Sequence, residues 1–234
     1  MNTTRELLIR LLNLFGTWSK KHSRKGLYEY MVSKLSSSVA SGMLLLSVGA
    51  GGEVASRINR TLAAERVDVQ LFSIDIAPIR APDVVGDACR IPFPDNYYDI
   101  VFLMEVLEHV HDPPQALVEI YRVLRPGGIL ILSVPFAFPL HDRPFDYFRF
   151  TKHGIELLLR NFEQVDVVER NNYGEAIAVL MMRLLVEKGY KARLLAMLFM
   201  LSGAVPFLAL LGRLIGSDAV TTGYVGSAKK RESY

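Results

Sequence analysis

Short apolar runs alternate with amphipathic stretches from about residue 43 onward, and this alternation predicts strands separated by helices. The runs have the length of buried strands, while the stretches between them carry apolar residues at helical spacing. Strands that alternate with helices favour a parallel sheet with helices on both faces. The expected strands span residues 43–48, 69–74, 84–85, 99–104, 129–134, 164–169 and 224–228.

The first expected strand ends at a glycine-rich turn that leads into a helix. Gly49, Ala50 and Gly51 stand in this turn. Glycines there let the backbone approach a ligand closely, and the amides at the start of the helix favour a negatively charged group. Asp75 ends the second strand 24 residues after Gly51, where a carboxylate can accept hydrogen bonds from ribose hydroxyls. The pattern therefore predicts a nucleoside cofactor at this edge of the sheet.

The connections between the strands differ in their helix signals. Residues 105–124 favour a helix that ends before Pro126. Thr151 is a candidate N-cap for a helix that continues to residue 160. Pro78 and Pro82 disfavour a helix between residues 75 and 84, so we expect a loop there.

Two apolar segments lie outside the predicted strands. Residues 7–15 favour an amphipathic helix, which either packs on the domain or lies on an anionic membrane surface. Residues 194–212 contain no charge and approach the length of a membrane span. Because the last strand has to return to the sheet, we expect instead a helical pair bent near Ser202, Gly203 and Pro206. Such a pair can form a lid, a dimer surface or a shallow membrane contact.

Composition narrows the class of protein further. The single cysteine among 234 residues, Cys89, excludes internal disulfides and cysteine-cluster zinc sites. A net charge of +3 is too mild to indicate nucleic-acid binding, and we expect no nucleic-acid partner. The mean hydropathy of +0.23 is high for a soluble enzyme and comes mainly from residues 194–212. We expect a cytoplasmic chain without a cleaved leader, associated with membranes if that segment contacts lipid.

Six motifs occur in an order that resembles the class I S-adenosylmethionine-dependent methyltransferases, most closely the small-molecule group called type 11. The resemblance covers roughly residues 40 to 170 and implies an α/β fold with a doubly wound, mostly parallel, seven-stranded Rossmann-like sheet. It assigns residues 1–40 to an N-terminal helical and basic segment and residues 41–234 to the methyltransferase domain, with a hydrophobic helical insertion at about 175–217. The motifs are residues 44–52, 73–76, 85–88, 91–95, 104–110 and 122–128.

The resemblance implies S-adenosyl-L-methionine as the cofactor. A nicotinamide dinucleotide is the competing ligand, but the third glycine of its fingerprint would fall at Val54 and crowd the pyrophosphate. Two positions depart from the family pattern, because it usually has an acidic residue at Ser47 and a glycine at Glu53. The cofactor contacts of the family fall on Ser47, Gly49, Ala50, Gly51, Asp75, Ile76, Asp87, Ala88 and Met104.

Acidic and imidazole side chains follow the fourth expected strand. Glu105, Glu108 and His109 share one face of the expected helix, and His141 in the loop after the fifth strand can face them. We expect His109, His141 and Glu105 to be the catalytic residues. We predict no metal, because charged residues on a helix face are more often solvated or structural. The four residues are nevertheless candidate ligands, since they resemble the metal site of RNA 2′-hydroxyl methyltransferases.

The aromatic and charged loop of residues 141–151 lies where the substrate is expected, at the carboxyl edge of the sheet. Tyr147 and Arg149 either contact substrate or anchor the loop. The Asn/Asp-Pro-Pro-Tyr/Phe signature is absent after the fourth strand, which disfavours methylation of amide or nucleobase nitrogen. We therefore predict O-methylation of a small-molecule, glycan or lipid-linked acceptor. The alternative is a non-catalytic binding protein of this fold that acts through its hydrophobic appendage, and a homodimer remains open.

Overall fold

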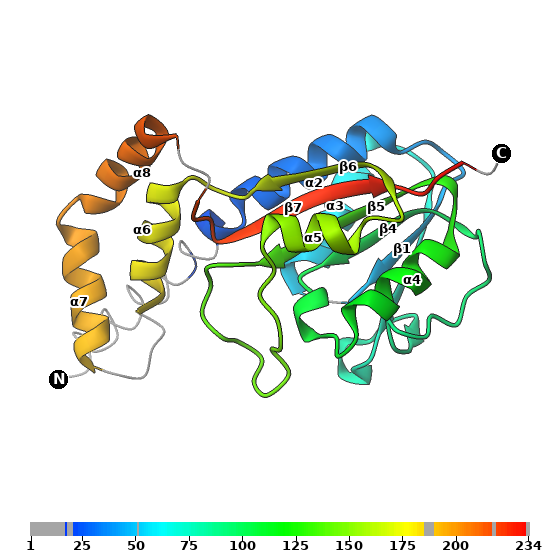
Figure 1. Cartoon of the computed structure of the whole chain (residues 1–234), viewed down its shortest axis with the longest axis horizontal. Helices are drawn as coiled ribbons and strands as arrows, with labels where there is room; N and C mark the ends of the chain where they lie inside the picture. The colour runs from blue at the N-terminus through cyan, green and yellow to red at the C-terminus, as the bar shows by residue number, and fades with distance from the viewer. Residues whose placement is uncertain (1–16, 18–20, 51, 185–189, 217–218, 233–234) are drawn as a thin grey trace. The chain divides into compact units, whose positions relative to one another are not determined.

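The computed structural model describes residues 17, 21–50, 52–184, 190–216 and 219–232. The expected helix at residues 7–15 and the glycine at position 51 lie outside these ranges. The chain forms two compact units (Figure 1). The first, called the sheet unit, comprises Leu27–Pro135, Leu140–Val168 and Tyr224–Tyr234; the second, called the helical unit, comprises Met1–Gly26, Phe136–Pro139 and Glu169–Gly223.

A seven-stranded sheet has the strand order β3-β2-β1-β4-β5-β7-β6, which confirms the predicted Rossmann-like architecture. The pairs β1–β2, β1–β4, β2–β3 and β4–β5 are parallel. β7 runs against β5, because Gly127 donates to the Lys230 carbonyl and Lys230 donates back to Gly128. The strands are β1 (Leu44–Val48), β2 (Gln70–Asp75), β3 (Val84–Val85), β4 (Tyr98–Met104), β5 (Leu124–Pro135), β6 (Glu163–Glu169) and β7 (Gly223–Lys229).

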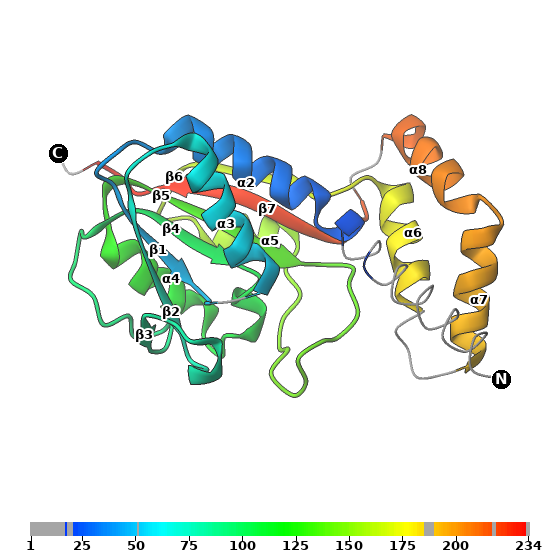
Figure 2. The same ribbon diagram turned by 180° about the vertical axis from the view of Figure 1, so that it is seen from behind.

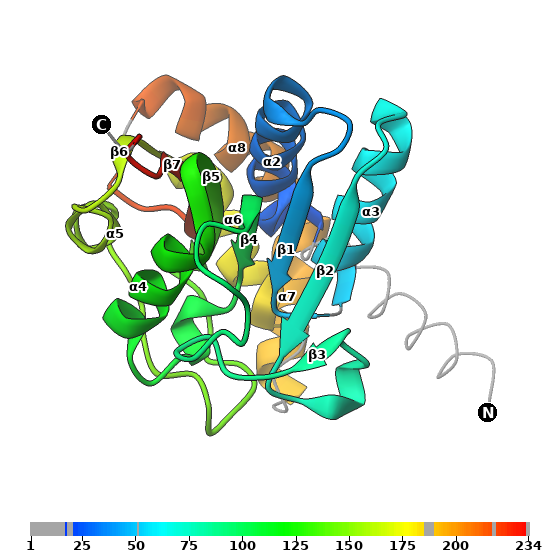
Figure 3. The same ribbon diagram turned by 90° about the vertical axis from the view of Figure 1, so that its right-hand side faces the viewer.

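Helices cover both faces of the sheet (Figure 3). Helices α2 (Lys25–Ser38) and α3 (Gly52–Glu65) lie on one face, as Figure 2 shows from behind, and α4 (Pro113–Val123) and α5 (Lys152–Leu158) lie on the other. α2 was not among the predicted elements. Its apolar residues recur at helical spacing and pack against α3 and the strands in the main core. The α2 contribution to this core is Leu27, Tyr28, Met31 and Leu35.

The helix predicted over residues 105–124 was wrong in its first half. Only a short 3₁₀ turn, η2 (Leu107–His109), follows β4, and α4 begins at Pro113 with Asp112 as its N-cap. Two successive prolines cannot donate the backbone hydrogen bonds of a helix interior, so the helix starts at them. The predicted end agrees within one residue, because α4 ends at Val123 with Leu124 as its C-cap. The fifth strand was predicted to begin at residue 129, whereas β5 begins at Leu124 and pairs irregularly with β4 before residue 129.

Two shorter predictions agree with the structure. Thr151 accepts a hydrogen bond from the Gly154 amide and caps α5, as its side chain predicted. The connection between β2 and β3 contains only the 3₁₀ turn η1 (Pro78–Arg80) in place of a crossover helix.

The helical unit contains α6 (Tyr173–Arg183), α7 (Tyr190–Leu201) and α8 (Ala204–Ile215). The chain breaks between α7 and α8 at Gly203, whose φ of 72° is left-handed, at the position predicted for the bend. α6 and α8 approach so closely that a Cβ on Gly174 would lie 1.8 Å from the Leu208 carbonyl oxygen. Within the described part of the chain, every helix is too short or too polar to cross a membrane.

Candidate functional site

The glycine turn after β1 is held by its neighbours in the sheet unit. Gly49 has a φ of +91°, and a Cβ at this position would lie 2.5 Å from Val106 Cγ2. Its amide donates to the Ile74 carbonyl at 2.8 Å. Ser47, which stands where the family has an acidic residue, is buried and donates to the Gly49 carbonyl at 3.2 Å. Glycine is therefore required at position 49 for both backbone conformation and space.

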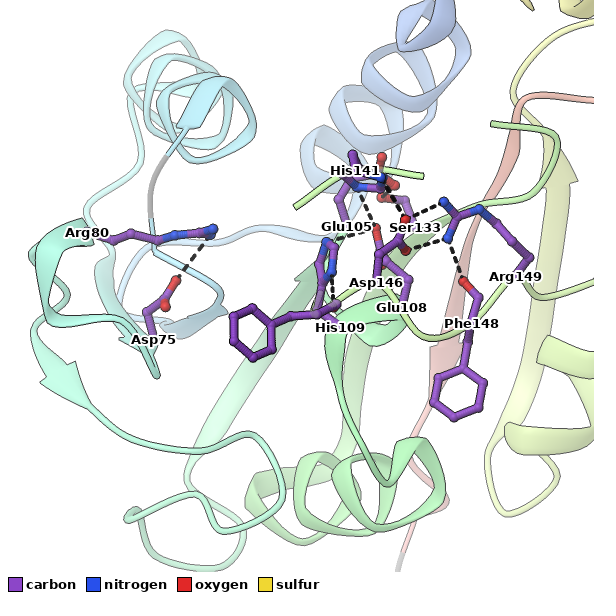
Figure 4. Close-up of polar contacts among 11 residues, drawn as sticks. Asp75, Arg80, Glu105, Glu108, His109, Ser133, His141, Asp146, Phe148 and Arg149 are labelled. Atoms are coloured by element: carbon purple, nitrogen blue, oxygen red, sulfur yellow. Dashed lines mark hydrogen bonds and ion pairs between the residues drawn. The ribbon is translucent and has the colours of Figure 1, made fainter. Parts of the chain in front are cut away.

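Asp75 lies beside this turn, because β1 and β2 are parallel neighbours and end at the same edge. Its carboxylate accepts hydrogen bonds from the Ala50 amide at 2.9 Å and the Ala77 amide at 2.8 Å. Arg80 Nη1 lies 3.5 Å from Asp75 Oδ2 (Figure 4). The side chain of Arg80 is half exposed, and an ion pair with such a group contributes little. A ribose hydroxyl can therefore displace Arg80 and share the carboxylate.

A cavity of about 210 Å³ opens beside the glycine turn and includes the predicted residues Ser47 and Ala50 in its lining. Ile76 is 72% exposed, so its side chain is open to a ligand. Asp87 is exposed and accepts a hydrogen bond from the Cys89 amide at 2.9 Å. The other two predicted cofactor residues, Ala88 and Met104, are buried. Contact of these residues with the cofactor stays a prediction.

A second set of polar side chains lies after β4 and β5. Glu108 is fully buried, and its Oε1 lies 3.7 Å from His109 Nε2 and 3.8 Å from His141 Nε2. The two imidazole rings are edge-to-face with centroids 5.0 Å apart. Figure 4 shows the three side chains turned toward one another, with Glu105 beside them. We call Glu108, His109 and His141 the Glu-His-His cluster.

The cluster is assembled by turns and not by a helix face. Glu105 has a φ of 57°, and its amide donates to the Ser133 carbonyl of β5. The Glu108 carbonyl accepts from the Tyr147 amide at 2.9 Å, which ties the loop of residues 140–151 to η2. The expectation that Glu105, Glu108 and His109 share a helix face is therefore corrected, because the turn after β4 brings them close.

Asp146 and Arg149 support the cluster from the same loop. Nη1 and Nη2 of Arg149 both donate to the Asp146 carboxylate, with Nη2–Oδ2 at 2.6 Å. Asp146 Oδ2 also accepts from the His141 amide at 2.8 Å. These bonds, chiefly those from Arg149, lower the pKa of Asp146 to about 2. Burial lowers the pKa of the His141 imidazole.

The two predicted substrate residues make contacts within the loop and its surroundings. Arg149 bonds Asp146, and Tyr147 lies against His111 with its hydroxyl 3.1 Å from Nε2. These contacts favour the anchoring alternative, while contact with substrate stays a prediction. Sequence reasoning missed the role of Asp146. Its signal was an acidic residue three positions before an arginine in a short loop.

Comparison with known proteins finds similarity to methyltransferases. Residues 46–132 match a family model described as a methyltransferase domain. A demethylmenaquinone methyltransferase from Renibacterium salmoninarum is 34% identical over 97 residues, which cover 39% of this chain and 41% of that protein. A malonyl-[acyl-carrier protein] O-methyltransferase from Serratia marcescens is 34% identical over 106 residues, which cover 43% of this chain and 42% of that protein. The chain spans less than half the length of these curated relatives.

A solved structure shares the fold. Phosphoethanolamine N-methyltransferase 2 from Haemonchus contortus, in complex with S-adenosyl-L-methionine, matches with a TM-score of 0.53 at 18% identity. The match covers 90% of this chain and 53% of that chain. Together with the sheet order, the glycine turn and the carboxylate beside it, the match shows that residues 46–132 belong to a methyltransferase domain of the class I S-adenosylmethionine-dependent family.

Proposed function

We propose that this protein transfers the methyl group of S-adenosyl-L-methionine to a hydroxyl group of a small-molecule, glycan or lipid-linked acceptor. One observation carries the proposal. The carboxyl ends of the parallel strands hold the glycine turn with Asp75, and the Glu-His-His cluster follows the neighbouring strands β4 and β5. The glycine turn and Asp75 suit the binding of a nucleoside, and the Glu-His-His cluster suits the activation of a hydroxyl. Both follow the carboxyl ends of strands, where ligands bind in sheets of this kind.

The transfer is an in-line displacement. The acceptor oxygen loses its proton and forms a bond to the methyl carbon, while the carbon–sulfur bond breaks and its electron pair stays on sulfur. The products are the methyl ether and S-adenosylhomocysteine. Holding the oxygen and the methyl group in line supplies much of the acceleration. His109, His141 and Glu105 are the residues that we assign to activation of the hydroxyl.

Apolar acceptors are favoured by two features. One relative named above acts, by name, on demethylmenaquinone. In the helical unit, Phe207, Leu210, Leu211 and Leu214 form an exposed stripe along α8 at helical spacing. Exposed apolar stripes of this kind mark interaction surfaces. We therefore assign residues 194–212 to shallow contact with a membrane that contains the acceptor.

Calorimetric titration with S-adenosyl-L-methionine tests the cofactor site. Wild-type protein is expected to bind, and Asp75→Asn is expected to lower the affinity at least about tenfold, because one lost charge-assisted hydrogen bond is worth roughly 1.5–3 kcal/mol. Asp95→Asn is the control, since this exposed residue precedes β4 at the other end of the strands. Absence of binding to the folded wild type would favour the non-catalytic alternative.

Transfer of labelled methyl groups tests the acceptor class. The label is expected to enter the lipid fraction of a cell extract. Hydrolysis in alkali or acid should identify the labelled product as an O-methyl compound. Label confined to carbon or nitrogen would contradict O-methylation, and relatives named as C-methyltransferases make this comparison necessary.

A further inference from the structure

The two units of the chain carry opposite net charge. The sequence ranges of the helical unit contain twelve lysine and arginine residues against five aspartate and glutamate residues, whereas those of the sheet unit contain fifteen against nineteen. The mild net charge of +3 therefore combines a basic helical unit of +7 with an acidic sheet unit of −4. An excess of one sign of charge attracts ligands of the other sign. The helical unit is thus the part of the chain that suits an anionic ligand.

Arg183, the last residue of α6, has its guanidinium group against an aromatic ring. Its Cζ lies 4.4 Å from the centroid of the Phe138 ring, a distance at which a cation and a ring face attract each other. Nε of Arg183 is buried and has no hydrogen-bond partner. The residue as a whole is partly exposed, so a ligand can reach the guanidinium group from solvent while the ring limits its movement.

The electrostatic surroundings of Arg183 are positive. Burial, and after it the charge of Arg24, lower the pKa of Arg183 to about 10. Among the residues that the structure describes, no carboxylate acts in the opposite direction on this guanidinium group. A cation that loses part of its hydration is stabilised when an anion pairs with it. The helical unit therefore holds a partly desolvated positive charge that an anion would stabilise.

We propose that Arg183 is the centre of a phosphate-binding site in the helical unit. The planar guanidinium group can donate two parallel hydrogen bonds to two phosphate oxygens. The negative charge of the phosphate would also offset the repulsion between Arg183 and Arg24. Contact with Phe138 holds the guanidinium group in place before the ligand arrives, which lowers the entropy lost on binding. The site requires neither methyl transfer nor the cofactor.

A phosphate group can come from a lipid headgroup or from a soluble phosphate ester. The exposed leucines of α8 lie in the same unit, and an apolar surface together with basic residues suits an anionic membrane. Both sources present the same chemistry to Arg183, so separate experiments with soluble phosphate and with vesicles distinguish them.

Titration with inorganic phosphate tests the site on the tag-free full chain. Backbone amide signals are followed by NMR while chloride keeps the ionic strength constant. Wild-type protein is expected to show saturable shifts, and Arg183→Gln should weaken binding about tenfold or more, because charge-assisted hydrogen bonds are lost. Arg213→Gln is the matched control, since Arg213 is an exposed arginine of α8 in the same unit. Its binding should resemble that of the wild type.

Stability without phosphate separates ligand binding from a purely structural role of Arg183. If the side chain served only to hold Phe138, Arg183→Gln would unfold at a lower urea concentration in every buffer. A phosphate site predicts no such loss in phosphate-free buffer, because the substitution removes a partly desolvated charge. Added phosphate should then raise the unfolding midpoint of the wild type alone. Should Arg183→Gln fail to fold, Arg183→Lys keeps the charge and loses only the paired geometry.

Flotation with vesicles identifies the source of the phosphate. Vesicles of phosphatidylcholine are compared with vesicles that also contain phosphatidate. A lipid source predicts that Arg183→Gln weakens binding to the phosphatidate vesicles more than Arg213→Gln does. A soluble source predicts that the two variants bind these vesicles equally, whereas only Arg183→Gln loses binding of inorganic phosphate. Either pattern supports the site.

Two results would overturn the phosphate site. One is folded wild-type protein that binds neither inorganic phosphate nor phosphatidate vesicles. The other is equal weakening by Arg183→Gln and Arg213→Gln in both assays, which would show diffuse attraction to a basic surface. Neither result bears on calorimetric titration with S-adenosyl-L-methionine, so failure of this site and failure of the proposed function are distinguishable.

Discussion

Asp146 organises the loop after β5 through its ionised carboxylate. It binds both the Arg149 guanidinium and the His141 amide, and its side chain is 1% exposed. The backbone of the same loop binds the Glu108 carbonyl. The position of His141 against Glu108 therefore depends on a single buried carboxylate and its hydrogen bonds.

The pH dependence of stability should reveal this carboxylate. Its pKa falls to about 2 in the folded protein, against about 3.9 in an unfolded chain. A lowered pKa stabilises the fold above the unfolded value, and this stabilisation is lost as the pH falls from 4 through 2. Urea unfolding at pH 5 and pH 2.5 should show a loss of about 1–2 kcal/mol that Asp146→Asn lacks. Asp142→Asn, in the same loop, should retain the wild-type loss.

Tight turns and close helix contacts set positions of helices that the hydrophobic periodicity of the sequence does not predict. After β4 the chain makes a 3₁₀ turn, because Pro113 and Pro114 delay the start of α4. In the helical unit, Gly174 of α6 lies against the backbone of α8 at Leu208. The start of α4 depends on the amide hydrogen that proline lacks. The close contact between α6 and α8 depends on the Cβ that glycine lacks.

Alanine at two helical glycines should separate packing from helix propensity. Gly174→Ala is expected to destabilise the helical unit by about 1–3 kcal/mol, because its Cβ would force α6 and α8 apart. Gly154→Ala in α5 is the control, since its nearest neighbour is the Thr151 hydroxyl at 3.2 Å. Its effect should stay below about 1 kcal/mol, in line with helix propensity. Urea unfolding and amide exchange in α6 and α8 measure both, and equal effects would contradict close packing.

For the whole molecule, the sheet unit carries the polar site and the helical unit carries the apolar stripe of α8. Leu210 and Leu214 in this stripe are 58% and 78% exposed. Water contact with such side chains is unfavourable, and burying one leucine contributes about 1.5–3 kcal/mol. An acceptor kept in a membrane would give this surface a function.

Flotation with anionic vesicles tests the stripe on the full chain. Wild-type protein is expected to float with the vesicles. Leu210→Glu or Leu214→Glu should lower the partition constant for vesicle binding at least about tenfold. Leu157→Glu is the matched control, because this leucine is 63% exposed on α5 of the sheet unit. If the Leu157 variant loses vesicle binding equally, or the wild type stays unbound, the stripe does not contact lipid.

The sequence by itself determined the elements whose causes are local. Apolar runs of strand length, the glycine turn after β1 and the Thr151 cap depend on neighbours within a few residues, so the positions of the strands along the chain and the start of α5 could be predicted. The bend at Gly203 belongs to the same class, because glycine adopts a left-handed φ without the steric cost that a Cβ brings.

Only the tertiary structure decided how the site is built. The contact between Glu108 and His141 joins a turn after β4 to a loop after β5, and Asp146 holds that loop through Arg149. No periodicity encodes such distances, because they depend on strand pairing and on hydrogen bonds between segments far apart in the chain. Burial of Glu108 likewise follows from everything that packs around it.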